Sequence, residues 1–462
     1  MRRIGILLAV PLAVTTACAG TSTAAGARSA GSAASSPGPA THFTDWPNFH
    51  NTVSKSGVAN GGVKLPLHQA WSRKLDGPVW SEPVIGDGVL ITATEHNAVY
   101  GLDPRTGKVL WEQKLAIPEP GSSQPCGDID PIGITGSPAY DPATGSVFVV
   151  DTSPSGHHTI WALSAKTGQR RWHRSGDPDK ARDMNAEQQR AALVVVDHRV
   201  IVTYGAHAGD CGNYVGYAMS VATNGKGRTP YYAVPNARQA GMWGPAGPVE
   251  AYDGNVLTPT ANGSNRTGGT WDHSDGVIEL SPRTMHYVRG WAPSNWEEGD
   301  ADDLSLGSTS PVQVAGDYVV GGKRGEVWLL KPTLGGVGGE LDTLGGDGFC
   351  NAFGGIAAVG NTAIIPCKNF SKPHSVLAVT VSNGKLHTKW TASGMYGAPV
   401  IAGQRVFVAD LDSGDLEVLS LKNGHVITSI PVGSLATFPS EVVDGNHVFV
   451  PTLSGITAIR GS

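Results

Sequence analysis

The sequence predicts an all-β protein, an eight-bladed β-propeller of four-stranded antiparallel blades whose ring is closed by an N-terminal strand. Three observations lead to this prediction: a composition rich in turn-forming residues, a strand pattern that recurs along the chain, and an unmatched strand at each end of the repeats. The 462 residues include 62 glycines and 31 prolines, and only 16% are charged. This composition suits many short strands joined by turns, whereas a helical bundle needs Ala, Leu, Glu and Lys at helical spacing.

Residues 80–115 contain one complete repeat, with three alternating apolar runs, a turn at 104–107 and a fourth run that contains Trp111. Runs of this length and alternation predict strands, so the segment is one four-stranded antiparallel unit. Sequence motifs similar to its third strand recur at residues 159–172, 215–225, 275–291, 325–335, 375–390 and 415–430. A repeat of this kind predicts a propeller, in which each unit forms one blade.

The two ends of the repeat region supply one further blade between them. Residues 456–459 have the pattern of a third strand, and the chain stops before a fourth. Residues 69–75 have the pattern of the fourth strand around Trp111, yet no first three strands precede them. Because pairing these ends removes two open sheet edges, we expect the strand around Trp71 to close a ring of eight blades.

Tryptophans stand at matching places in four repeats, namely Trp71, Trp111, Trp172 and Trp390. Large aromatic side chains contribute most per residue to a packed core, so we expect these tryptophans to pack one blade against the next. A ligand-binding aromatic cluster is the alternative.

The N-terminus has the features of an export signal. Arg2 and Arg3 are basic, and residues 4–14 form an apolar run too short to span a bilayer as a helix. The small residues before Cys18 resemble a bacterial lipobox, in which the cysteine becomes the new N-terminus and carries the lipid, although Thr15 stands where Leu is usual. The alternative is an ordinary secretory signal that is cut elsewhere.

These features predict three segments. Residues 1–17 are a lipoprotein signal peptide, residues 18–42 are a disordered tether of mostly Gly, Ala, Ser, Thr and Pro, and residues 43–462 are the propeller. A lipid on Cys18 would place the protein outside the cytoplasm, anchored to the cell membrane.

Four cysteines remain after Cys18, an even number in an exported chain, which favours disulfides over metal ligation or catalysis. Cys350 and Cys367 flank one candidate hairpin and form the natural local pair. Cys126 and Cys211 would then join neighbouring repeats. Neither pair has the CxxC spacing of a zinc site, so we expect no metal there.

The sequence motif at 102–111, in which Leu-Asp is followed by Thr-Gly-Lys and Trp111, resembles the repeat of pyrroloquinoline quinone (PQQ) propellers. The likeness covers roughly residues 43–460, and residues 45–49 are similar to the opening segment of that family. The family includes quinone-dependent dehydrogenases and non-catalytic lipoproteins, such as the propeller subunit of the outer-membrane protein assembly machinery. The resemblance therefore implies the fold and leaves two functions open.

The dehydrogenase branch binds PQQ and Ca²⁺ on the propeller axis, with a Glu and an Asn as metal ligands, an Asp as base and a vicinal Cys-Cys disulfide. By resemblance, Asn262 stands in the Asn-bearing stretch, Asp302 or Asp303 in the region of the base, and Lys323 where some members contact the quinone. Cys211 falls where the Glu would be. The resemblance thus implies a site that is only partly retained.

Two departures from the family pattern argue against catalysis. A hard cation needs several oxygen ligands, and Cys211 removes an anionic one. Cys126 is single, so the vicinal disulfide is missing. We therefore expect a non-catalytic, membrane-anchored extracytoplasmic lipoprotein without a cofactor, whose remaining residues form a vestigial quinone and calcium pocket: Asn262, Asp302, Asp303 and Lys323. For the first three, ordinary turn chemistry is the alternative.

This expected protein is a monomeric propeller that binds an envelope protein or a cell-surface ligand. The alternative function is a PQQ- and calcium-dependent dehydrogenase that acts on alcohols or sugars. A net charge of −5 removes the usual electrostatic reason to expect nucleic-acid binding.

Overall fold

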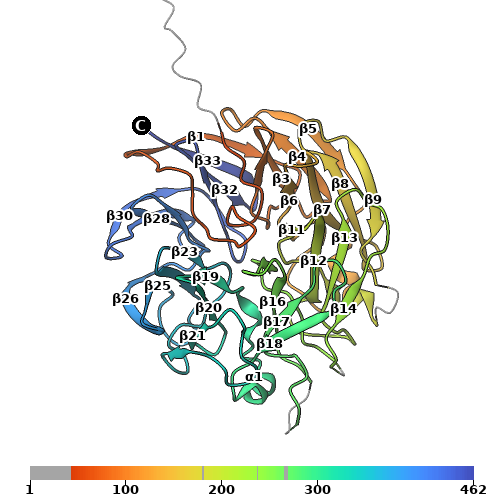
Figure 1. Cartoon of the computed structure of the whole chain (residues 1–462). Helices are drawn as coiled ribbons and strands as arrows, with labels where there is room; N and C mark the ends of the chain where they lie inside the picture. Colours follow the sequence, from red (N-terminus) through yellow and green to blue (C-terminus); the bar gives the residue numbers. More distant parts are fainter. Residues whose placement is uncertain (1–42, 179–181, 237, 265–268) are drawn as a thin grey trace, which may run out of the picture. The chain divides into compact units, whose positions relative to one another are not determined.

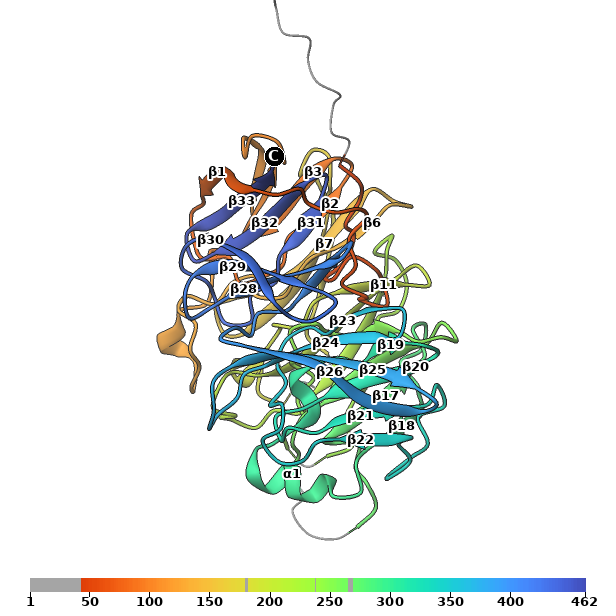
Figure 2. The ribbon, with the colours of Figure 1, turned by 90° about the vertical axis from the view of Figure 1, so that its left-hand side faces the viewer.

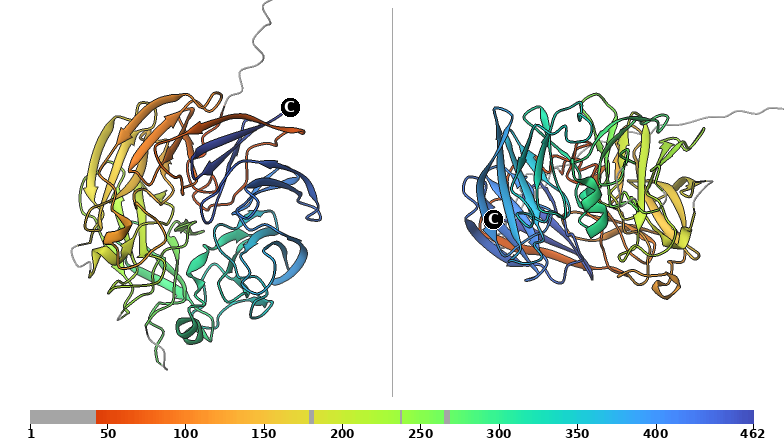
Figure 3. Two further views of the ribbon diagram at one scale, coloured as in Figure 1. Left: turned by 180° about the vertical axis from the view of Figure 1, so that it is seen from behind. Right: turned by 90° about the horizontal axis from the view of Figure 1, so that it is seen from below.

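The computed structural model describes residues 43–178, 182–236, 238–264 and 269–462, which form an eight-bladed β-propeller (Figure 1). The predicted signal peptide (1–17), its lipid attachment site Cys18 and the predicted tether (18–42) lie outside the described residues. The blades follow one another around a ring, which Figure 3 shows from behind and from below. The predicted fold class is confirmed.

Seven blades are consecutive in the chain, and all pairings within them are antiparallel. The first two blades are β2 (Val84–Gly86), β3 (Val89–Ala93), β4 (Ala98–Leu102) and β5 (Val109–Lys114), then β6 (Ala139–Asp141), β7 (Ser146–Ser153), β8 (His157–Ser164) and β9 (Arg170–Ser175). The third is β10 (Glu187–Gln188), β11 (Val194–Val196), β12 (Arg199–Ala206), β13 (Tyr217–Ala222) and β14 (Tyr231–Ala233). The fourth is β15 (Val249–Glu250), β16 (Val256–Thr260), β17 (Gly276–Leu280) and β18 (Tyr287–Trp291).

The remaining consecutive blades continue in the same way. The fifth is β19 (Val312–Val314), β20 (Asp317–Gly321), β21 (Val327–Leu330) and β22 (Asp342–Leu344). The sixth is β23 (Ala357–Val359), β24 (Thr362–Cys367), β25 (Ser375–Ser382) and β26 (Lys385–Ser393). The seventh is β27 (Val400–Ala402), β28 (Arg405–Asp410), β29 (Asp415–Ser420) and β30 (Val426–Pro431).

The third blade differs from the four-stranded pattern because its innermost position is divided. β10 and β11 both pair with β12, at opposite ends of that long strand. Arg190 lies in the break between them, and it becomes important for the cavity described below.

The eighth blade joins the two ends of the domain. β31 (Val442–Asp444), β32 (His447–Thr452) and β33 (Gly455–Gly461) supply three strands, and β1 (Leu67–Lys74) is the fourth. β1 runs antiparallel to β33 from Leu67 opposite Gly461 to Lys74 opposite Gly455. The predicted closure by the strand around Trp71 is therefore confirmed, and it gives the eighth blade its fourth strand.

The four matching tryptophans join neighbouring blades through one repeated contact. Each indole Nε1 donates to a backbone carbonyl in a turn of the next blade: Trp71 to Pro104, Trp111 to Ala165, Trp172 to Thr223 and Trp390 to Leu421, at 3.0–3.1 Å. Each ring packs on the glycine of that turn, namely Gly107, Gly168, Gly225 and Gly424, all with φ of +65° to +71°. The tryptophans thus pack blade to blade, as predicted.

The N-terminal segment before β1 crosses the middle of the ring. Trp46 pairs with Ile85 of β2 in the first blade, and the carbonyl of Gly57 accepts a hydrogen bond from Ile401 of β27 in the seventh. Between them, the buried Lys55 donates through Nζ to the carbonyl of Ala246. This segment therefore ties together blades that do not touch one another.

Helical structure is minor in this domain. The α-helix α1 (Trp296–Asp302) follows the fourth blade, and short 3₁₀ turns occupy Gly121–Ser123, Met184–Ala186 and Leu306–Ser308. Figure 2 shows α1 and β1 at opposite sides of the ring. Across the described ranges, no helix is both long enough and apolar enough to cross a membrane.

Candidate functional site

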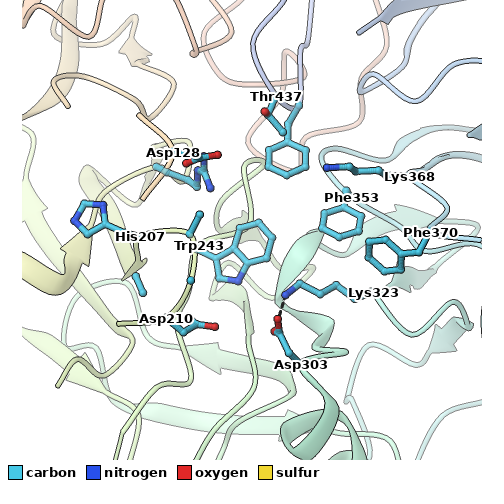
Figure 4. Close-up of a pocket in the computed structure, with 15 residues that line it drawn as sticks. Asp128, His207, Asp210, Trp243, Asp303, Lys323, Phe353, Lys368, Phe370 and Thr437 are labelled. Carbon is cyan, nitrogen blue, oxygen red and sulfur yellow. Dashed lines mark hydrogen bonds and ion pairs between the residues drawn. The ribbon is translucent and has the colours of Figure 1, made fainter. Parts of the chain in front are cut away.

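A cavity of about 350 Å³ lies where loops from most of the blades meet (Figure 4). Its lining comes from segments spread along the chain, including Asp128 after the first blade, Arg190 and the residues after β12 in the third, and Lys323 after β20 in the fifth. Phe353, Lys368 and Phe370 flank strands of the sixth blade, and Thr437 and Phe438 precede the eighth. Loops from so many blades can converge only near the axis of the ring.

Four aromatic side chains give this cavity flat, apolar walls. The rings of Phe353 and Phe438 are stacked with centroids 5.7 Å apart and an angle of 7° between planes. Trp243 lies 6.4 Å from Phe353 and 6.2 Å from Phe438, and Phe370 meets Phe353 edge-on at 5.8 Å. Such walls favour a planar, conjugated ligand.

Three cationic side chains lie against these rings. Lys323 Nζ is 5.4 Å from the centroid of Trp243, and Lys368 Nζ is 5.8 Å from Phe353 and 5.9 Å from Phe438. The guanidinium of Arg190, a buried residue, lies 5.7 Å from Phe438 and 5.8 Å from Trp80. Cations held on ring faces with little water around them attract anions strongly. Aromatic walls and cationic side chains together are features that suit a flat anion.

One carboxylate in the cavity is tied to one of these cations. Asp303 Oδ1 accepts a hydrogen bond from Lys323 Nζ at 2.8 Å. Asp303 caps the C-terminus of α1 in the left-handed conformation, with φ of +55°, and its side chain remains 62% exposed. Lys323 is only 14% exposed. The pair places an accessible carboxylate at the rim, held by a mostly buried ammonium group.

The opposite wall carries Asp128, His207 and Asp210 beside a disulfide. Burial lowers the pKa of His207 to about 4, so its ring is neutral near pH 7. Asp210 Oδ1 accepts a hydrogen bond from the Tyr214 hydroxyl at 2.5 Å. The Cys126–Cys211 disulfide joins the two loops of this wall, and the Cys350–Cys367 disulfide fixes the end of β24 next to Lys368. Both bridges that the sequence predicts are present.

The residues selected from the sequence separate into two groups. Asp303 and Lys323 line the cavity and contact each other. Asp302 is the last residue of α1 and is exposed outside the cavity lining. Asn262 is buried, 5% exposed, and its carbonyl accepts a hydrogen bond from Ala240, so it also lies outside the lining.

Most of the site was missed by sequence reasoning. The residues overlooked are Arg190, Trp243, Phe353, Lys368 and Phe438. They lie in irregular loops between strands and share no spacing. The only available signal was an aromatic residue beside glycines in loops that lie outside the repeated strands, as at 241–245 and 352–355.

The side chains present do not form a calcium site of the family type. Cys211, at the position of the Glu ligand, is bonded to Cys126, and Asp303 is paired with Lys323. Within the described ranges, no cluster of three or more His, Cys, Asp or Glu residues could hold a metal ion. The donors therefore do not fit a hard cation, whereas the rings and cations fit a planar anion such as PQQ.

The fold is an eight-bladed propeller whose axial cavity combines aromatic walls with cationic side chains. The family model described as outer membrane protein assembly factor BamB matches residues 60–229. The 1-butanol dehydrogenase (cytochrome c) of Thauera butanivorans is 26% identical over 303 residues, which cover 58% of this chain and 41% of that protein. The chain spans less than half the length of the curated relatives it matches.

Solved structures agree with this assignment at the level of the fold. The quinohemoprotein alcohol dehydrogenase of Comamonas testosteroni has a TM-score of 0.70 at 16% identity, over 90% of this chain and 80% of that chain. BamB of Moraxella catarrhalis has a TM-score of 0.58 at 18% identity, over 86% of this chain and 100% of that chain. The chain is thus similar in sequence and in fold to PQQ-like β-propellers.

These comparisons correct three expectations drawn from the sequence. The curated relatives are named as alcohol dehydrogenases, two of them as quinohemoproteins. The expectations of a non-catalytic scaffold, of a chain that is not an enzyme, and of no cofactor are therefore wrong. The physical reason is that they rested on the lost Glu and vicinal disulfide and took no account of the aromatic and cationic residues that line the cavity: Arg190, Trp243, Phe353 and Lys368.

Proposed function

We propose that this propeller is the dehydrogenase part of a quinoprotein that oxidises alcohols with PQQ bound in the axial cavity. The observation that supports it most is the combination of aromatic walls with Arg190, Lys323 and Lys368 in one cavity. PQQ is a flat, conjugated anion with three carboxylates. Its rings match the stacked walls, and its carboxylates match the three cations.

In this proposal, PQQ would accept two electrons from the alcohol. The protein would orient PQQ and provide the base that takes the alcohol's proton. Trp243 and Phe353 offer ring faces that hold a planar ligand in one orientation. Asp303 is the candidate base, because its carboxylate is accessible at the cavity and is fixed by Lys323 at 2.8 Å. It would take the hydroxyl proton of an alcohol, and Lys323 would then be free to pair with an anionic group of the ligand.

The test compares two neighbouring aspartates in the full chain. With PQQ added, Asp303→Asn should abolish reduction of an artificial dye by primary alcohols, because the base is lost, while PQQ still binds. Asp302→Asn is the matched control, since that carboxylate is exposed outside the cavity lining, and it should keep the wild-type rate. Equal activity of the two variants, or no binding at tens of micromolar PQQ, would reject the proposal.

A further inference from the structure

We propose that this cavity holds the quinone without a calcium ion and that Lys368 supplies the positive charge at the ligand in place of a metal. This inference rests on the proposed function and concerns how the same site holds its ligand. It starts from the disagreement between the family-type metal site and the side chains that are present here.

The carboxylates that line the cavity already interact with neighbouring groups. Asp303 is paired with Lys323, and Asp210 accepts the Tyr214 hydroxyl. Asp128 interacts electrostatically with the guanidinium of Arg190. A calcium ion takes six to eight oxygens at short range, so binding it here would require breaking these contacts and gathering carboxylates from opposite walls. The sulfur of Cys211 cannot replace the missing Glu, because it is bonded to Cys126.

The three cations differ in how much charge they leave for a ligand. Lys323 is neutralised by Asp303 at 2.8 Å. Arg190 interacts with the charges of Asp128 and Glu95. Lys368 is different, because no carboxylate within the described ranges forms an ion pair with it. The cavity therefore presents one ammonium group whose charge is uncompensated, and an anionic ligand is the partner it lacks.

The position of Lys368 makes this charge available to a ligand. The residue directly follows β24, whose last residue, Cys367, is held to Cys350 by a disulfide. Its Nζ lies 5.8 Å from the ring of Phe353 and 5.9 Å from that of Phe438, and Figure 4 shows its amino group pointing toward the centre of the cavity. A planar ligand that stacks there would bring a carboxylate or a quinone oxygen to Lys368 Nζ.

The same loop offers a matched control. Lys372 lies four residues further on, and its Nζ donates to the carbonyl of Phe349 at 2.6 Å and lies 5.8 Å from the ring of that residue. It is thus also a lysine on a phenylalanine ring, but it does not line the cavity. Lys368→Met and Lys372→Met remove one charge each from one loop, so a general change in charge or in loop stability affects both variants.

The experiment is a titration of the full chain with PQQ, followed by quenching of tryptophan fluorescence, in EDTA and in millimolar Ca²⁺. We expect the wild type to bind equally in both, within about twofold. Lys368→Met should weaken binding about tenfold or more, as expected for loss of a charged hydrogen bond, and Ca²⁺ should not restore it. Lys368→Arg should recover most of the affinity, and Lys372→Met should bind as the wild type does.

The opposite outcomes are separable. Binding that occurs in Ca²⁺ and disappears in EDTA would overturn this inference and leave the proposed function intact. Wild-type affinity of Lys368→Met, or an equal loss in Lys372→Met, would remove Lys368 from the site. No binding in either buffer would reject the proposed function and this inference together.

Discussion

Replacing Gly168 by alanine tests the contact that joins one blade to the next. Gly168 lies in the turn between β8 and β9 with φ of +70°, and a Cβ built there would lie 2.5 Å from Trp111 Cε3. The left-handed backbone costs an alanine about 1 kcal/mol. Forcing a methyl group into packed surroundings costs about 1–3 kcal/mol more. Gly168→Ala should therefore destabilise the domain by about 2–4 kcal/mol.

Gly384→Ala isolates the backbone part of this cost. Gly384 lies in the corresponding turn of the sixth blade, between β25 and β26, with nearly the same φ of +68°, and nothing lies within 4 Å of a Cβ built there. This variant should lose only about 1 kcal/mol. Urea unfolding followed by intrinsic fluorescence measures both variants against the wild type.

A double-mutant cycle isolates the steric part. In a Trp111→Ala background the ring that Gly168 touches is gone, so Gly168→Ala should cost only the backbone term, and the coupling energy should be about 1–3 kcal/mol. If Gly168→Ala is no worse than Gly384→Ala, or costs the same with and without Trp111, the tryptophan contact does not hold the blades as argued.

Three further predictions concern pH, closure and location. Burial raises the pKa of Glu95 from 4.5 to about 7, so the folded protein keeps a proton that the unfolded chain releases, and stability should fall by up to about 1.4 kcal/mol per unit as pH rises across that window. Glu95→Gln should flatten this slope in melting temperature against pH, and parallel curves would contradict the assignment. Deleting residues 43–75 should leave the last blade with an open edge and make the protein poorly soluble, whereas melting like the full domain would disprove the role of the closing strand. Cys18→Ser should release the protein into the medium in cell fractionation, and a wild type that is already soluble there would refute lipid anchoring.

The fold could be predicted because its determinants repeat. The blades place their apolar runs at similar spacing, and four of them share an outer tryptophan, so one complete repeat at 80–115 reveals the others. The closing strand followed from the same pattern, because residues 69–75 match the strand that contains Trp111. The divided inner strand of the third blade was not predicted, since the break at Arg190 has no counterpart in other repeats.

The site could be predicted only where a resemblance pointed to it. The choice between Asp302 and Asp303 depends on one residue at the end of α1, where the left-handed turn at Asp303 moves the chain from the exposed helix surface to the cavity. Trp243, Lys368 and Phe438 come together only because the ring brings distant loops to its axis. That proximity is a property of the closed ring and leaves no trace in local sequence.

The closed ring also has a consequence for how the protein is made. The hydroxyl of Thr44 donates to Asp444, 400 residues later, and β1 pairs with β33 at the far end of the chain. Closing a loop of that length costs roughly 5 kcal/mol of chain entropy, and contacts so distant in sequence form slowly. Because synthesis proceeds from the N-terminus, β1 leaves the ribosome before every other strand of the ring and must wait for its partner β33. The pairing of β1 with β33 is therefore the contact that closes the ring. A chain interrupted at any point before β33 has an unpaired first strand.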